Sequence, residues 1–200
     1  MIAASKEQLL EMVQKREVPE ACTEALLKNW QLRNKVVAWM GFVLVTKNWV
    51  RSLASWIDDR KCLEIMAGCG CLSYALQQEG VAVIPTDDFS WEDRWASANH
   101  LWTDVYKIDA IKAIKLYGRN VDFIIMAFPY MDELAAKCLK TMRKVAPDCQ
   151  MIYIGEEDGG CTADDDFFEV ANFIEDIEFN EAVREFKSWR FMYDRPYLVR

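Results

Sequence analysis

The spacing of apolar residues predicts helices over the first sixty positions, because apolar side chains recur there every three or four residues. Ser5 stands where it can open a capping box at the start of a first helix. Pro19 suits the first turn of a second helix, and the apolar stretch 36–45 suits a buried helical segment. Thr46 is placed to cap a third helix. No linker follows, so we expect this region to pack on the rest of the chain.

From position 61 onward, short apolar runs alternate with helical patterns, which is typical of a sheet with helices on both faces. The runs are nearly continuous, as in parallel strands that are covered on both sides. The expected strands are 62–66, 81–84 (continuing to Asp87), 122–127 and 151–154. The expected helices are 72–78, one beginning near Ala110, 134–145, and one that starts from a capping box at 162–165 and continues to Ile174. The tail, 177–200, is expected to form two strands joined near Lys187, as an antiparallel edge hairpin.

Length and composition favour one globular unit. The chain has 200 residues, enough for one sizeable core, so we expect residues 1–60 to extend a domain that spans 61–200. Hydrophobic residues make up 52% of the chain, yet no run reaches the roughly eighteen apolar residues of a membrane span. The first residues lack the features of a secretory signal, and seven cysteines, an odd count, favour reduced thiols. These features predict a cytoplasmic protein.

Charge and potential metal ligands narrow the choice of partner. The formal net charge is −8 and the basic residues are scattered, which opposes nucleic acid as a substrate. Zinc needs clustered ligands, but the one close cysteine pair is Cys69 and Cys71 and the one histidine is His100. We therefore expect no metal. The sequence does not indicate which oligomeric state the protein adopts.

A glycine-rich turn joins the first expected strand to the next helix. Glycine lets the backbone approach a ligand closely, and the helix N-terminus offers free N–H groups. The turn contains Gly68 and Gly70, and Glu64 lies in the strand before it. Asp87 ends the second strand, where an acidic residue binds ribose hydroxyls in nucleotide folds. Together these features favour a nucleotide-type ligand, although the glycines alone also suit a plain strand–helix turn.

From about residue 61 to residue 154, the chain resembles the class I S-adenosylmethionine-dependent methyltransferases. In that family the first strand ends in Glu/Asp-x-Gly-x-Gly-x-Gly. Glu64, Gly68 and Gly70 match this motif, and Met66 replaces its first glycine. The resemblance implies an α/β, Rossmann-like, doubly wound and mostly parallel sheet with an antiparallel C-terminal edge strand.

The resemblance also implies S-adenosylmethionine as cofactor and S-adenosylhomocysteine as its product. NAD is the rival, but Ser73 stands where a dinucleotide motif has its third glycine. Asp109 fits the family's acidic residue that faces the adenine, or it caps the following helix. The residues expected to hold the cofactor are Glu64, Met66, Ala67, Gly68, Gly70, Asp87, Asp88, Asp109, Ala110 and Ala127.

The end of the fourth strand bears on the acceptor. Methyltransferases of amino groups have Asp/Asn-Pro-Pro-Tyr/Phe there, whereas this chain has Ala127-Phe128-Pro129-Tyr130. The polar acceptor is absent, which argues against adenine-N6 or cytosine-N4 methylation. The aromatic residues suit either substrate stacking or core packing.

Two further segments are expected near the acceptor, because ligands of open parallel sheets bind beyond the carboxyl ends of the strands. In the loop after the fifth strand, Glu156 or Asp158 suits a general base or a cation-binding group, or else a solvated acidic turn. Trp91 and Trp95 suit an aromatic wall or ordinary packing. We expect Tyr130 and Glu156 as catalytic residues, and as substrate-binding residues Phe128, Pro129, Tyr130, Trp91, Trp95 and Asp158.

Three functions remain open at this point. The first is a methyltransferase acting on a small molecule in an apolar pocket with one acidic wall. Such a pocket favours a flat or hydrophobic acceptor that carries an amine. The second is a sensor or scaffold that binds the cofactor without catalysis, which Met66 and Ala127 favour. The third, a nucleic-acid methyltransferase, is opposed by the acidic charge.

Overall fold

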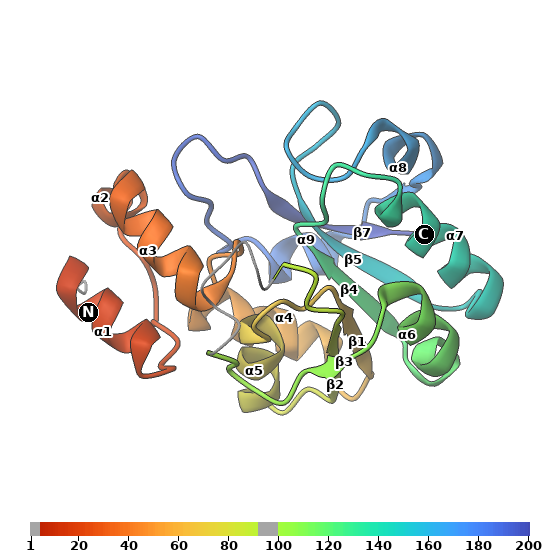
Figure 1. Ribbon diagram of the computed structural model, residues 1–200, viewed down its shortest axis with the longest axis horizontal. Coiled ribbons are helices and arrows are strands. Elements are labelled where there is room, and N and C mark those ends of the chain that lie inside the picture. The colour runs from red at the N-terminus through yellow and green to blue at the C-terminus, as the bar shows by residue number, and fades with distance from the viewer. Residues whose placement is uncertain (1–4, 92–99) are drawn as a thin grey trace.

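Seven strands form one mixed sheet at the centre of the computed structural model, which describes residues 5–91 and 100–200 (Figure 1). The strand order is β3-β2-β1-β4-β5-β7-β6. Neighbouring strands from β3 to β5 run parallel, and β7 pairs antiparallel with both β5 and β6. The strands are β1 (Cys62–Ile65), β2 (Val83–Asp87), β3 (Tyr106–Lys107), β4 (Phe123–Ala127), β5 (Gln150–Gly155), β6 (Phe173–Ile174) and β7 (Arg195–Val199). The predicted doubly wound sheet with an antiparallel edge is confirmed.

Helices cover both faces of the sheet (Figure 1). One core cluster contains apolar residues of α4, α5 and α9 together with the N-terminal helices, and the other contains residues of α6, α7 and α8. The helices are α1 (Lys6–Gln14), α2 (Glu24–Leu27), α3 (Trp30–Met40), α4 (Lys47–Ile57), α5 (Cys71–Gln78), α6 (Ala110–Tyr117), α7 (Leu134–Val145), α8 (Asp165–Val170) and α9 (Ile177–Ala182). Within the described ranges, none of these helices combines the length and apolarity that crossing a bilayer requires.

The N-terminal region is helical, with different boundaries from those expected. Ser5 forms the predicted capping box with Gln8. Pro19 opens no helix, because its carbonyl accepts a hydrogen bond from the N–H of Lys47 and α2 begins only after Thr23. The stretch 36–45 is not one helix either, since α3 ends at Met40, before Gly41. Gly41 has a φ of +89°, a conformation that glycine adopts without strain. Thr46 precedes α4 without a capping hydrogen bond from its side chain.

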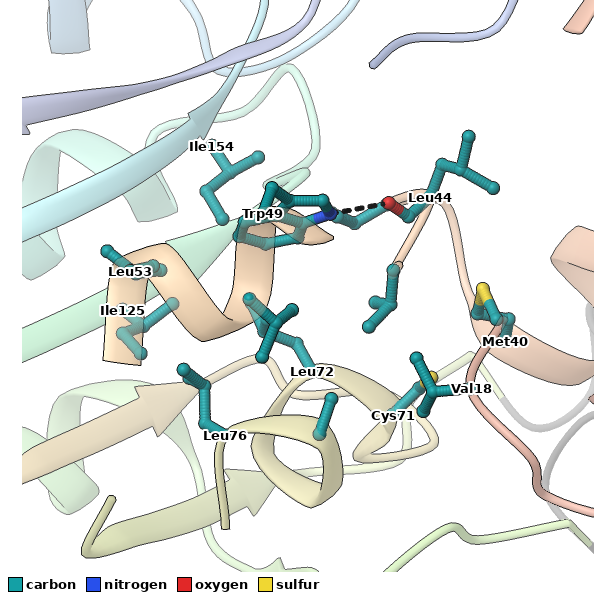
Figure 2. Close-up of a cluster of buried hydrophobic side chains, with 14 of the residues drawn as sticks. Val18, Met40, Leu44, Trp49, Leu53, Cys71, Leu72, Leu76, Ile125 and Ile154 are labelled. Carbon is teal, nitrogen blue, oxygen red and sulfur yellow. Dashed lines mark hydrogen bonds between the residues drawn. The ribbon is translucent and has the colours of Figure 1, made fainter. Parts of the chain in front are cut away.

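The N-terminal helices pack against the sheet and against α5 (Figure 2). The fully buried Trp49 donates its indole N–H to the carbonyl of Leu44 at 3.0 Å. In the same core lie side chains from α4, α5, β4 and β5, among them Leu53, Leu72, Leu76, Ile125 and Ile154. Residues 5–60 therefore share their apolar core with the sheet.

The C-terminal third differs most from the sequence expectation. Thr162 does not cap α8, because its hydroxyl accepts from the N–H of Glu156, and Asp164 caps the helix instead. The helix stops at Val170, and Phe173–Ile174 form strand β6. The tail contains α9 and one strand, β7, so the expected hairpin of two strands joined near Lys187 is wrong. The antiparallel edge is made by β6 and β7.

Candidate functional site

The turn between β1 and α5 adopts a left-handed backbone at three positions. Met66, Gly68 and Gly70 have φ values of 55°, 56° and 72°. A Cβ at Gly70 would lie 2.7 Å from Cγ2 of Val105, so packing requires glycine there. A Cβ at Gly68 would meet nothing within 4 Å. The left-handed conformation of Met66 is ordinarily adopted by glycine, the residue that Met66 replaces in the motif.

Asp87, at the end of β2, organises the backbone of this region. Its Oδ2 accepts from the N–H of Gly68 at 2.7 Å, and its Oδ1 accepts from the N–H of Phe89 at 2.6 Å and from the indole N–H of Trp91 at 2.9 Å. Burial raises the pKa of the Asp87 carboxyl, and these three hydrogen bonds oppose the rise. A buried carboxylate with three donors is a rigid support for the glycine turn.

Glu64, in β1, is buried beneath the same turn. Its Oε2 accepts from the backbone N–H of Ser73 at 3.0 Å and also from the hydroxyl of Ser73. Ser73 lies in the first turn of α5, so Glu64 satisfies a helix N–H that has no partner within the helix. Burial raises the pKa of Glu64 to about 7, against the effect of both Ser73 bonds.

Glu64, Met66, Gly68 and Asp87 help to line a cavity beyond the carboxyl ends of β1, β2 and β4. The empty volume of this cavity is about 1080 Å³, including open solvent. Of the ten residues expected to hold a cofactor, eight line it: Glu64, Met66, Ala67, Gly68, Asp87, Asp88, Ala110 and Ala127. The other two lie elsewhere. Gly70 is the N-cap residue before α5, and Asp109 caps α6 by accepting from the N–H of Lys112. The fold thus brings most of this set together, and their role in binding stays a prediction.

The described residues give the cavity an acidic character. Glu64, Asp87 and Asp88 are its charged lining residues, and no Lys, Arg or His lines it within residues 5–91 and 100–200. Opposite charges attract more strongly where water is scarce, as beside the buried carboxylate of Asp87. The arrangement therefore suits a cationic ligand and opposes a phosphate-rich one such as NAD.

The other wall of the cavity is apolar, and part of it comes from residues that the sequence analysis did not single out. These residues lie in α3 and in the segment that follows it: Val37, Met40, Gly41, Phe42, Val43 and Val45. Phe42 stacks on Phe128, with ring centroids 5.6 Å apart and 16° between the ring planes. Phe128 follows β4 and has a φ of 50°, while its N–H continues the ladder to the carbonyl of Ile154 at 2.8 Å. No spacing in the sequence pairs position 42 with position 128.

The residues expected to contact the acceptor fall into three groups. Trp91, Phe128, Pro129 and Tyr130 line the cavity. Trp95 lies outside the described residues. Glu156 and Asp158 are not among the residues that line the cavity, and this placement differs from the acidic wall expected there.

Glu156 instead joins two loops. Its Oε2 accepts from the N–H of Cys161 and its Oε1 from the N–H of Tyr193, both at 2.8 Å. Burial would raise the pKa of Glu156, but these backbone hydrogen bonds outweigh it, and the pKa lies below its usual value. Both carboxylate oxygens thus hold backbone N–H groups.

Comparison with solved structures identifies the architecture. A magnesium protoporphyrin IX methyltransferase from Synechocystis PCC 6803, with bound SAM, has a TM-score of 0.52 and 17% identity, covering 86% of this chain and 84% of that one. A TehB-like SAM-dependent methyltransferase from Corynebacterium glutamicum has a TM-score of 0.50 and 14% identity, covering 88% of this chain and 98% of that one. The chain has the class I methyltransferase fold. At these identities the likeness establishes a shared fold. No family model and no curated protein sequence matches the chain.

In this class I methyltransferase fold, the cavity lies at the carboxyl ends of the central strands. Open parallel sheets generally bind their ligands at this position. Its acidic part lies on the glycine turn and the end of β2. Its apolar part lies between α3 and the segment after β4. The site thus places an acidic part beside an apolar part.

Proposed function

We propose that this chain is an S-adenosylmethionine-dependent methyltransferase that acts on a small apolar molecule. The observation that carries the proposal is the open space at Gly68, on the turn that lines the cavity. Among the described residues that line this cavity, the charged side chains are carboxylates. S-adenosylmethionine carries a sulfonium and an ammonium group, and carboxylates attract both. A glycine whose missing side chain leaves space lets such a ligand approach the backbone.

Each acidic residue has a proposed part in holding the cofactor. Following the family motif, Glu64 would face the methionine end, while Asp87 and Asp88 would face the ribose. Asp87 is already oriented by its bonds to Gly68 and Trp91, so little ordering is needed when a ligand binds. When bound, the cofactor supplies an activated methyl group.

The acceptor is proposed to bind against Phe42, Phe128, Pro129 and Tyr130, with Trp91 at the cofactor side. Methyl transfer from a sulfonium depends mainly on holding the acceptor in line with the methyl group. A wall fixed by the Phe42–Phe128 stack and by the strand ladder at Phe128 supplies such positioning. We assign Glu156 a structural role in holding two loops, because both of its carboxylate oxygens accept from loop backbone.

Calorimetry with S-adenosylhomocysteine tests cofactor binding, and we expect micromolar affinity. Gly68→Val places a side chain in the cavity and should abolish the heat of binding. Gly80→Val is the matched control, because Gly80 also has a positive φ, 90°, and open space around its Cβ, but it does not line the cavity. Both variants place valine at a positive φ, and only the first changes the cavity, so only the first should lose the ligand. Equal binding by the two variants would place the cofactor elsewhere.

Incubation with labelled S-adenosylmethionine and small-molecule extracts tests catalysis. We expect label in a small-molecule product that resists nuclease treatment. NAD should not displace the cofactor at equal concentration, because the lining carboxylates repel its phosphates.

The alternative is a protein that binds the cofactor and transfers nothing. The left-handed Met66 favours it, because the motif's first glycine has become a side chain that lines the cavity. Tight cofactor binding with no labelled product from any extract would support this alternative.

A further inference from the structure

Within residues 5–91 and 100–200, four aromatic side chains line the same cavity as the three carboxyl groups. They are Phe42, Trp91, Phe128 and Tyr130. Phe42 and Phe128 stack with nearly parallel rings, and the indole N–H of Trp91 is held by Asp87. Aromatic rings and carboxyl groups therefore come together in one cavity rather than on separate faces of the molecule.

This combination has a chemical preference beyond simple hydrophobicity. The face of an aromatic ring attracts organic cations, and aromatic side chains are the usual means of recognising quaternary nitrogen. The carboxylates that line the cavity add Coulomb attraction for a cation and repel an anion. The lining carboxylates would therefore repel an acceptor that is a thiolate, a phenolate or a carboxylate.

We infer that the methyl acceptor is a flat, neutral nitrogen heterocycle, which leaves the site as an N-methyl cation. The inference rests on the proposed function, because it concerns the acceptor of that reaction. The lone pair of the ring nitrogen forms the new N–CH₃ bond. The bond between the methyl carbon and the sulfonium sulfur breaks, and its electron pair stays on sulfur. The products are the N-methyl cation and S-adenosylhomocysteine.

No proton moves in this step, so it needs no general base. The positive charge passes from sulfur to nitrogen, toward the side of the cavity that contains Phe128 and Tyr130. The aromatic faces can stabilise the charge as it develops on the heterocycle, and Asp88 at the exposed rim can stabilise it through space. The product cation is thus the species that the cavity is expected to hold best.

Binding can be measured without turnover, on the full chain saturated with S-adenosylhomocysteine. The probes are three bicycles of similar size: N-methylisoquinolinium (a cation), 2-naphthol (neutral) and 2-naphthoate (an anion). We expect the cation to bind about tenfold more tightly than 2-naphthol, and 2-naphthoate to bind most weakly. A cation that binds no better than 2-naphthol overturns the inference.

Two variants separate the contributions of ring and charge. Phe128→Leu keeps an apolar side chain at the same strained backbone position and should remove most of the cation's advantage. Asp88→Asn should reduce that advantage, whereas Asp148→Asn, on the exposed segment before β5, should leave it unchanged. An advantage that survives both cavity variants also overturns the inference.

Turnover gives an independent arm, with isoquinoline, 2-naphthol and 2-naphthalenethiol as acceptors and labelled S-adenosylmethionine as donor. We expect N-methylisoquinolinium as the main product, and faster methylation of either other compound overturns the inference. If no bicycle is methylated, the binding measurements decide. Absence of S-adenosylhomocysteine binding, measured first, would instead refute the proposed function, so the two failures are distinguishable.

Discussion

The carboxylate of Asp87 accepts a hydrogen bond from the backbone N–H of Gly68 at 2.7 Å, which ties the end of β2 to the turn after β1. The carbonyl of Thr86 adds a second tie by accepting from the N–H of Ala67 at 3.0 Å. The shape of the glycine turn therefore depends on the neighbouring strand as well as on its own glycines.

Replacing Asp87 should weaken cofactor binding and also destabilise the fold. Asp87→Ala leaves the N–H groups of Gly68, Phe89 and Trp91 without their acceptor, and it removes a proposed ligand of the ribose. We expect a loss of about 1–3 kcal/mol in S-adenosylhomocysteine affinity, measured by calorimetry, and a lower Tm. Asp148→Ala is the control on an exposed position. Unchanged affinity in Asp87→Ala would remove Asp87 from the cofactor site.

Glu64 should make stability depend on pH. Its pKa rises from an ordinary 4.5 to about 7 on folding because the carboxyl is buried. The unfolded chain therefore ionises first, and this contribution to stability is fully present below pH about 4.5 and is lost as the pH rises to about 7. Glu64→Gln keeps an oxygen that can accept from Ser73 but does not titrate.

Thermal unfolding of Glu64→Gln at several pH values checks this expectation. Relative to the unsubstituted protein, the variant should gain stability between pH 5 and pH 8, by up to about 3 kcal/mol. Glu169→Gln, on the surface of α8, should show no such gain. A stability difference that does not change with pH would mean that Glu64 is ionised throughout. The same variant should bind S-adenosylhomocysteine more weakly, because it lacks the carboxylate.

The N-terminal helices should be required for a soluble protein. A fragment that begins at Lys61 would expose the surfaces of Leu72, Leu76 and Ile125 that residues 5–60 cover in the shared core. It would also lack the cavity wall that contains Phe42. We expect the fragment to be insoluble when expressed beside the full chain. A folded fragment that binds S-adenosylhomocysteine with full affinity would show that the helices are a separate module.

Glu156→Ala should lower stability while leaving cofactor affinity nearly unchanged. The variant leaves the N–H groups of Cys161 and Tyr193 without a carboxylate partner, and these lie in two loops rather than in the cavity. We expect a loss of about 1–3 kcal/mol in the free energy of unfolding. Calorimetry with S-adenosylhomocysteine provides the comparison, and abolished binding in a folded variant would move Glu156 to the cofactor site.

Local sequence signals determined the parts of this protein that depend on neighbours along the chain. The capping box at Ser5, the buried runs of β1 and β4, and the glycine turn after β1 all follow from residues a few positions apart. The signal failed where partners outside the expected helix took over a residue. Thr162 reads as a helix cap, but its hydroxyl bonds instead to the N–H of Glu156 and to the Tyr153 hydroxyl.

Tertiary structure decided which further residues share the cavity. Glu64, Gly68 and Asp87 were found from the motif because parallel strands bring their carboxyl ends to one edge of the sheet. Phe42 was not, since its position opposite Phe128 depends on how α3 packs on the sheet, and no periodicity encodes that contact. Glu156 is not among the cavity's lining residues for a similar reason: its loop follows β5 at the expected edge, but its carboxylate is held by the backbone N–H groups of residues 161 and 193.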